Sequence, residues 1–462
     1  MKKHSKYIIR FAGLAFLIAL VLSSCKKWID TDINIDPDSP ADVPMKLMLP
    51  AIEQNLGYVM AGNDFVMTTN VWMQQFDGIS RQAKVESRYQ LLPADVNNAW
   101  NSIYTGTFMN AKVMIDKAEK TEGKESPYNA GVARVLIATS LGIATDLFGD
   151  LPFSKAFRGT ENVLKPAFDS QEKLYDTLYT ILDDAVADFN STTNLVEVDG
   201  DVVYDGDIAK WKKAAYSIKA RHDLQLSEVN GDAAYTAALA DAANGFSSND
   251  DDFIIPWNAD NHNPIFQFME QRGDISMSAT LIDLMKVNND PRLPFYAAKD
   301  GDDNYTGSAL GAHDANASAP GDYIAGATAP SYIMTYSELK FIEAEANLKL
   351  GKTTEAQDAF EEAVASSVLR VTGSANTSWL AANVNGTPVS MDLIMTQKYI
   401  NSFGTNQAFA DYRRTGLPAL TIPPDALLPT LPARFPYAQD EISYNGANVP
   451  SVTLSDKLWW DK

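Results

Sequence analysis

The chain has 462 residues and a mass of 50.6 kDa, enough for one large domain or roughly two to three ordinary ones. Apolar residues make up 45% and charged residues 21%, so the composition predicts a packed globular core and excludes a wholly disordered chain. Asp and Glu outnumber Lys and Arg by 59 to 38, a formal charge of −21. This excludes a general nucleic-acid binder, because phosphate contacts require clustered cations. A single cysteine excludes a disulfide framework and a cysteine-rich metal site.

Residues 1–24 have the pattern of a secretory signal peptide. A basic start precedes the apolar run 11–22, which is shorter than the ~20 residues of a membrane-spanning helix. The run ends in Leu22-Ser23-Ser24-Cys25, the pattern of a bacterial lipobox, so we expect Cys25 to be lipidated and to start the mature chain. An ordinary signal peptide that leaves a free cysteine is the alternative. The acidic, proline-containing segment 25–44 is expected to be an extended tether.

The remaining chain, 45–462, is expected to form a single body. Apolar residues recur at helical spacing over 45–245 and 333–416, which are therefore predicted to be mainly helical. Asn, Asp, Gly, Pro and Ser are dense in 246–332, and prolines are dense in 417–462. These two segments are predicted to form a loop-rich layer with few short strands over the helices. The fold class is therefore mainly α.

The clearest helical unit begins with a capping box at Thr335 and Glu338. A first helix is predicted to end near Leu350, after which Gly351 turns the chain into a second helix. The small and aromatic residues around this turn fall at the packing positions of a tetratricopeptide repeat: Ala344, Ala356, Phe360 and Ala363. The pattern predicts a tetratricopeptide-like helical hairpin, and an ordinary helical hairpin is the alternative.

Other positions make local predictions about helix starts and about the core. Asp169 with Glu172 predicts one helix start, and Asp207 predicts another. Trp100 and Trp211 lie within helical patterns, so they are predicted to be core residues.

No pattern in the sequence specifies a reaction. There is no two-histidine zinc motif, no serine elbow and no glycine-rich phosphate loop. Asp300, Asp302 and Asn304 resemble the start of a calcium-binding loop, but Tyr305 and Gly311 stand where that loop has Gly and Glu. We therefore predict no catalytic residue, no cofactor and no metal site.

Two segments combine aromatic rings with polar side chains in predicted loops. Sugars present apolar ring faces that stack on aromatic side chains, and hydroxyl groups that hydrogen-bond to amides, carboxylates and guanidinium groups. The residues predicted to bind a ligand are Trp72, Gln75, Arg81 and Tyr89 in the first segment and Trp257, Asn258, Asn263 and Phe266 in the second.

Several strings, in order along the chain, resemble the SusD/RagB family of outer-membrane nutrient-binding lipoproteins from Bacteroidetes. The ordered series is more specific than any one string and covers most of the chain. It runs through Asp146-Leu147-Phe148-Gly149-Asp150-Leu151-Pro152-Phe153, Asp205-Gly206-Asp207 with Trp211, Asn289-Asp290-Pro291-Arg292-Leu293, Met334-Thr335-Tyr336-Ser337-Glu338, Asp411-Tyr412-Arg413-Arg414-Thr415-Gly416 and Pro432 to Tyr437. Within these strings, Arg413 and Arg414 are predicted to tie loop carbonyls or carboxylates.

The resemblance implies a mostly helical body with about four tetratricopeptide-like units. It also implies a lipid-anchored protein of the outer membrane, facing outward, that acts as a lid on a SusC-like TonB-dependent transporter. Such a lid captures an oligosaccharide without converting it.

Three alternatives stay open from the sequence. They are a peptide-binding member of the same family, a surface glycoside hydrolase, and a tetratricopeptide scaffold that binds only proteins. The sequence does not predict which glycan or peptide is bound, because stacking platforms recognise ring faces generally.

Overall fold

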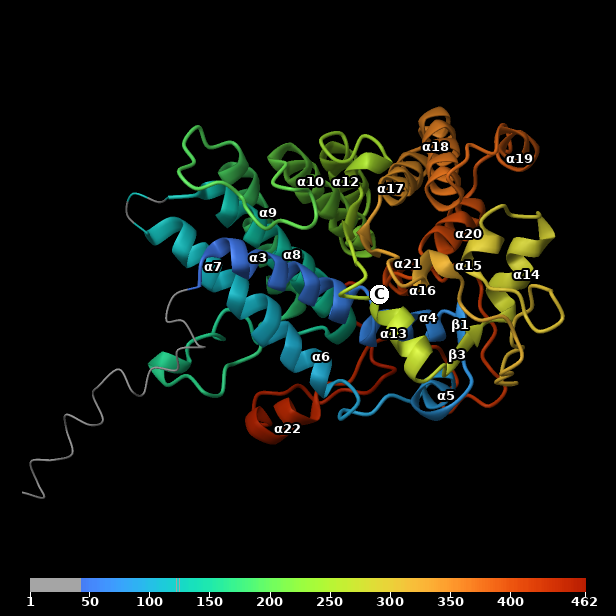
Figure 1. Cartoon of the computed structure of the whole chain (residues 1–462), viewed down its shortest axis with the longest axis horizontal. Helices are drawn as coiled ribbons and strands as arrows, with labels where there is room; N and C mark the ends of the chain where they lie inside the picture. The colour runs from blue at the N-terminus through green and yellow to red at the C-terminus, as the bar shows by residue number, and fades with distance from the viewer. Residues whose placement is uncertain (1–42, 122, 124) are drawn as a thin grey trace, which may run out of the picture. The chain divides into compact units, whose positions relative to one another are not determined.

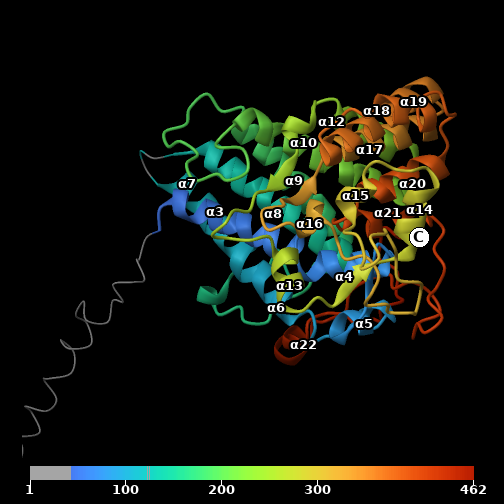
Figure 2. The same ribbon diagram turned by 45° about the vertical axis from the view of Figure 1, so that its right-hand side comes forward.

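The computed structural model of the chain describes residues 43–121, 123 and 125–462. The predicted signal peptide, Cys25 and nearly all of the tether lie outside the described residues. Met45–Lys462 form one compact unit. In this unit the long helices lie along one side, and α5, α13 and α22 lie on the opposite side (Figures 1 and 2). The fold is mainly helical, as predicted.

Eight long helices build an array in which each packs against the next. The helices pair as α3 with α7, α8 with α9, α10 with α12, and α17 with α18, in agreement with about four predicted units. Their bounds are α3 (Met45–Asn55), α7 (Met109–Lys120), α8 (Pro127–Phe148), α9 (Gln171–Phe189), α10 (Ile208–Gln225), α12 (Asp232–Ala242), α17 (Tyr336–Lys349) and α18 (Thr353–Thr372).

The predicted tetratricopeptide-like hairpin is confirmed as α17 and α18. Thr335 is the N-cap of α17, where its side chain accepts a hydrogen bond from the backbone N–H of Glu338. Gly351 turns the chain at φ +75°, a conformation that glycine adopts without steric cost. The four packing residues Ala344, Ala356, Phe360 and Ala363 are fully buried.

The other predicted helix starts differ in detail. Asp207 caps α10 as predicted. The start of α9 lies one residue later than predicted, because Ser170 is the N-cap and accepts from the backbone N–H of Lys173. The carboxylate of Asp169 instead accepts hydrogen bonds from the backbone N–H and the hydroxyl of Ser154. A long-range bond has therefore replaced the expected local cap.

Short elements form the rest of the body. Two-stranded antiparallel sheets join β1 (Phe76–Gly78) to β3 (Ile275–Met277), and β2 (Phe253–Ile255) to β4 (Ser331–Met334). π-Helical turns occupy η2 (Leu56–Met60) and η3 (Ile103–Phe108), and 3₁₀ turns occupy η4 (Gly159–Glu161) and η5 (Asn249–Asp251). The shorter helices are α4 (Asp64–Trp72), α5 (Arg81–Ser87), α6 (Asn97–Ser102), α11 (Ser227–Asn230), α13 (Pro264–Gln271), α14 (Ala279–Val287), α15 (Leu293–Tyr296), α16 (Asp322–Ala325), α19 (Thr377–Asn383), α20 (Met391–Asn401), α21 (Gln407–Thr415) and α22 (Gln439–Asn445).

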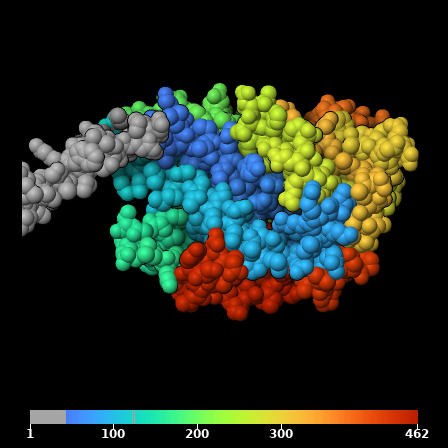
Figure 3. All heavy atoms as spheres, turned by 60° about the horizontal axis from the view of Figure 1, so that its bottom comes forward, coloured from blue at the N-terminus to red at the C-terminus, as the bar shows by residue number. Residues whose placement is uncertain are grey.

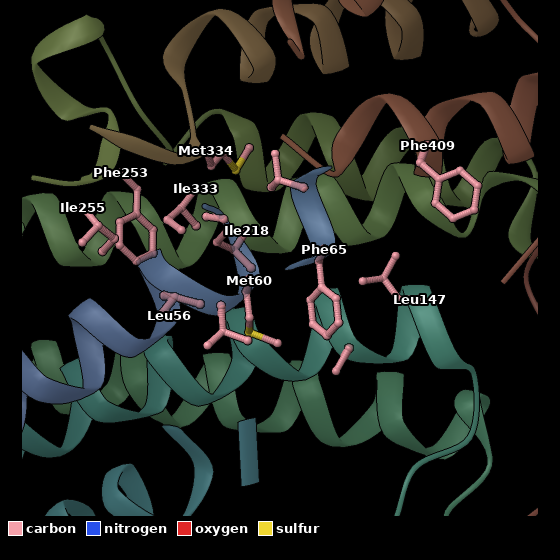
Figure 4. Close-up of a cluster of buried hydrophobic side chains, with 14 of the residues drawn as sticks. Leu56, Met60, Phe65, Leu147, Ile218, Phe253, Ile255, Ile333, Met334 and Phe409 are labelled. Atoms are coloured by element: carbon pink, nitrogen blue, oxygen red, sulfur yellow. The ribbon is translucent and has the colours of Figure 1, made fainter. Parts of the chain in front are cut away.

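The main core lies between the helical array and the short elements. In Figure 4, Leu56 and Met60 from the first part of the chain lie near Phe253 and Ile333, which belong to the second sheet, and Phe65 lies nearer to Leu147 of α8. Helix α8 runs through this core. It is long and apolar enough to cross a membrane by length and composition alone, but 89% of its apolar window is buried inside the body. The burial of this window fits a core helix.

Arg413 and Arg414 of α21 tie carbonyl and carboxylate groups, as the sequence predicted. Arg413 donates to the backbone carbonyls of Asp146 and Ala433, at 2.6 and 2.9 Å. Arg414 pairs with the carboxylates of Glu345 and Asp411. These fixed donors hold segments that are far apart in the sequence.

Candidate functional site

Three predicted ligand residues of the first segment belong to the core. Trp72 is fully buried against Phe409 and Phe435, with ring centroids 5.5 and 5.0 Å away. The amide of Gln75 donates to the carbonyl of Tyr399 at 2.7 Å, and Tyr89 is 1% exposed. Their aromatic and amide groups therefore have no surface that is open to a ligand. The predicted loop position was wrong for Trp72, which ends helix α4.

The second segment is divided between structural and exposed residues. Trp257 is 6% exposed and donates its indole N–H to the hydroxyl of Ser331. Asn263 is buried and caps α13. Asn258 is exposed at a turn, where its side-chain oxygen accepts from two backbone N–H groups. Phe266 is half-buried on α13. Of these four predicted residues, only Asn258 and Phe266 therefore keep surface for a ligand.

The pairing of β1 with β3 brings the two predicted segments together. Arg81, at the start of α5, donates to the carboxylate of Asp274 at 2.8 Å and to the carbonyl of Arg272 at 2.8 Å. Arg272 pairs with the same carboxylate at 3.2 Å. This contact joins residues that are 193 positions apart in the sequence. It places Arg81 beside Asp274, which lines a groove between α5 and α13.

We call this concavity the α5–α13 groove. It holds about 580 Å³ of empty space, including space that is open to solvent. Figure 3 shows the face of the molecule on which α5 (blue) and the segment around α13 (yellow) lie. The residues that line the groove are Asn63, Asp64, Phe65, Met67, Thr68, Gln82, Ala83, Glu86, Leu91, Asp95, Val96, Phe268, Arg272, Asp274 and Phe435.

The charges in the groove are unevenly paired. Asp274 forms ion pairs with both Arg81 and Arg272. The other acidic residues of the lining, Asp64, Glu86 and Asp95, have no cation within ion-pair distance among the described residues. Burial raises the pKa of Glu86 to about 8, and the carboxylates of Asp95 and Asp64 add to the effect. Burial also raises the pKa of Asp64. At neutral pH the Glu86 side chain is therefore mainly a neutral acid that can donate a hydrogen bond.

The groove suits a ligand that carries several hydrogen-bonding groups. Gln82 offers an amide, Glu86 a protonated carboxyl and Asp95 a carboxylate, while Phe268 offers part of a ring at the rim. No group of three or more potential ligands for a metal ion occurs within residues 43–121, 123 and 125–462. The arrangement can therefore bind polar organic molecules through hydrogen bonds and ring contacts.

The sequence prediction named Arg81, which contacts the groove residue Asp274, but it named none of the residues that line the groove. Phe266 and Phe268 are two positions apart on α13, about 200° around the helix axis, so only Phe268 lines the groove. The helical register of α13, starting at the Asn263-Pro264 cap, is the signal that would have separated the two rings. Gln82 and Glu86 are four positions apart on α5, so they lie on one face of that helix.

The comparisons with known proteins agree with the fold. Residues 37–438 match the model of the SusD-like family that is described as starch-binding and associating with the outer membrane. The chain belongs to this SusD-like family. No match was found among curated proteins.

Solved structures of SusD-like proteins have the same fold. A SusD/RagB family protein from Bacteroides thetaiotaomicron is 23% identical, with a TM-score of 0.76, and the match covers 91% of this chain and 99% of that one. A chitin-binding SusD homolog from Flavobacterium johnsoniae is 23% identical, with a TM-score of 0.78, and the match covers 90% and 98% of the two chains. A SusD homolog from Bacteroides uniformis is 22% identical, with a TM-score of 0.76 over 90% and 99%.

Proposed function

We propose that this chain is a glycan-binding lipoprotein of the outer membrane that captures an oligosaccharide without converting it. The family is described as starch-binding, and one structural relative is named as chitin-binding. The single observation that carries the proposal in this chain is the α5–α13 groove, where hydrogen-bonding side chains lie beside the ring of Phe268.

The binding mode follows from the chemistry of the groove. A sugar ring would place one apolar face against Phe268 while its hydroxyl groups pair with Gln82 and Asp95. Glu86, neutral at pH 7, would donate to a hydroxyl or acetamido oxygen. Phe65 and Phe435, the other aromatic residues of the lining, are buried, so among the lining residues only Phe268 can stack on a sugar ring. We therefore expect moderate affinity and ready release.

The anchor and the transporter partner complete the proposal. Lipidation at Cys25 would hold the body at the outer membrane, and a SusC-like TonB-dependent barrel would receive the ligand. The body would then act as a lid on that barrel. Purification of the native protein from membranes in mild detergent tests both points, since mass spectrometry reports the acyl groups at Cys25 and a co-purifying barrel reports the partner.

One observation favours a second candidate ligand. Asp64 and Asp95 line the groove without paired cations among the described residues, so a peptide with Lys or Arg side chains would be attracted to it. Such a peptide is the alternative ligand of the same site.

Titration calorimetry with chito-oligosaccharides, malto-oligosaccharides and a basic peptide distinguishes these candidates. Binding of a glycan, together with unchanged glycan length after prolonged incubation, supports the proposal. Binding of the peptide alone supports the alternative ligand. Steady release of reducing ends by the pure protein would overturn the non-catalytic part.

A further inference from the structure

A second concavity lies on another part of the body. We call it the α7–α8 hollow. It shares no lining residue with the α5–α13 groove and holds about 900 Å³ of empty space, including space that is open to solvent. Its walls come from η3, α7, α8, α9 and the segment 153–158, which is green in Figure 3. The apolar residues of the lining are Phe108, Ile115, Ile137, Phe153, Ala156, Phe157 and Ile181.

The charged residues of this lining are mainly cations. The lining contains three cations, Lys112, Arg134 and Arg158, and one carboxylate, Asp116. This excess of positive charge contrasts with the formal charge of −21 of the whole chain. Three of the four have partners that do not line the hollow. Arg134 pairs with Glu119 and Asp188, Arg158 with Glu161, and Asp116 with Lys120.

Lys112 is the exception. Its ammonium group is exposed and has no hydrogen bond or ion pair among the described residues. Its charge therefore remains available to a ligand that enters the hollow.

One wall of the hollow is held mainly by packing. Residues 156–163 form hydrogen bonds only within 153–163. Phe157 fixes this segment by its ring, which lies 6.0 Å from Tyr104 and 6.1 Å from Phe108, centroid to centroid. The backbone of Phe157 has φ +62°, a strained conformation for a bulky residue. This segment can therefore change its conformation when a ligand binds, without breaking hydrogen bonds to the rest of the body.

We propose that the α7–α8 hollow is a binding site for an amphiphilic carboxylate, a molecule with an apolar chain or ring system and one anionic head. Ligand sites are commonly concave and apolar, with a few polar groups that fix orientation. Here the apolar body would lie against Phe108, Ile137 and Ile181. The carboxylate would pair with Lys112 at the rim.

The same lining argues against a sugar in this hollow. The only hydroxyl side chain among the lining residues is that of Ser154, and it already donates to the carboxylate of Asp169 at 2.6 Å. The carboxylate of Asp116 and the guanidinium groups of Arg134 and Arg158 are also already held in ion pairs. A sugar would therefore lose the hydrogen bonds of its hydroxyls to water and find few replacements. This site is separate from the proposed glycan site in both position and chemistry.

The test uses the full chain with Cys25→Ser, which cannot be acylated, and three probes of equal chain length. Decanoate, decanol and decylammonium are titrated by calorimetry below their micelle concentrations. We expect decanoate to bind more tightly than decanol, and decylammonium to bind most weakly. Equal affinity of decanoate and decylammonium, or no binding of either decanoate or cholate, would overturn the proposal. Cholate as a further probe distinguishes ring systems from straight chains, and binding of either carboxylate supports the shared chemistry.

Variants locate the site. Lys112→Gln should weaken decanoate binding by about three- to fivefold, the contribution of one exposed ion pair, and should leave decanol binding unchanged. Lys286→Gln, an exposed lysine on α14 that lines neither concavity, is the matched control. Ile115→Ser should weaken both probes. If Lys112→Gln and Lys286→Gln bind decanoate equally, the assignment of the head group is wrong. Glycan affinity, measured on the same samples, reports the other site independently.

Discussion

The guanidinium group of Arg413 lies over two aromatic rings. It is 4.7 Å from the ring centroid of Trp460 and 3.9 Å from the ring centroid of Phe409. The indole N–H of Trp460 donates to the carboxylate of Asp146 at 2.9 Å. Burial lowers the pKa of Arg413 to about 10, so the group stays charged at neutral pH. This arrangement ties the last residues of the chain to α21 and α8.

Trp460→Ala should therefore destabilise the body although the residue lies two positions from the end of the chain. The side chain is fully buried, and removal of a buried tryptophan costs about 3–5 kcal/mol. Urea unfolding measures the loss. Trp459→Ala, which removes a half-buried neighbour, is the control and should cost clearly less. Equal losses for the two variants would contradict the role of the Arg413 contact.

The buried ion pair between Arg221 and Glu338 predicts a second, non-additive effect. The guanidinium donates to both carboxylate oxygens at 2.6 and 2.7 Å, and its Nη2 also donates to the carbonyl of Ile333. Glu338→Gln leaves a buried cation without its charge partner, which costs about 3–5 kcal/mol. The double variant Arg221→Met with Glu338→Leu should lose less free energy of unfolding than either single change. Additive losses in denaturant titrations would refute the coupling.

Glu86 predicts a pH dependence of stability. Its pKa of about 8 in the folded chain lies above the ~4.3 of an unfolded glutamate, so the folded state binds the proton more tightly. Its contribution to stability is therefore full below about pH 4.3 and is lost as the pH rises toward 8, with a limiting slope of about 1.4 kcal/mol per pH unit.

The variant Glu86→Gln isolates this contribution from the other titrating groups. From pH 5 to pH 8 the parent chain should lose the stability contributed by protonated Glu86, whereas the variant has no group there that titrates. The unfolding free energy of the variant should therefore rise relative to that of the parent chain over this range. Above pH 8 it should become constant. A difference that does not change with pH would show that Glu86 titrates normally.

Phe268 predicts the strength of ring contact in the α5–α13 groove. Phe268→Ala should weaken glycan binding by about two- to tenfold, which corresponds to the 0.5–1.5 kcal/mol of one ring contact. Phe295→Ala, a 40% exposed ring on α15 that does not line the groove, is the matched control. Unchanged affinity in Phe268→Ala would show that the glycan binds elsewhere on the body.

Local patterns predicted the helical unit at Thr335 because a cap and a turn depend on a few neighbouring residues. The same reasoning separated Trp211 correctly as a core residue, which is fully buried. It failed for Trp72, whose surroundings come from α21 and from the segment that holds Phe435. A tryptophan next to polar residues has the same local pattern whether its ring faces the core or a ligand.

The sequence by itself determined the helical class, the family-specific series of strings, and the expectation of a lipid anchor at Cys25, because each depends on residues close together in the chain. The tertiary structure alone decided which predicted ligand residues keep open surface. The pairing of β1 with β3 placed Arg81 beside Asp274, and the register of α13 turned Phe268 rather than Phe266 to the groove. Such contacts join residues almost 200 positions apart, so no local pattern can encode which faces remain exposed.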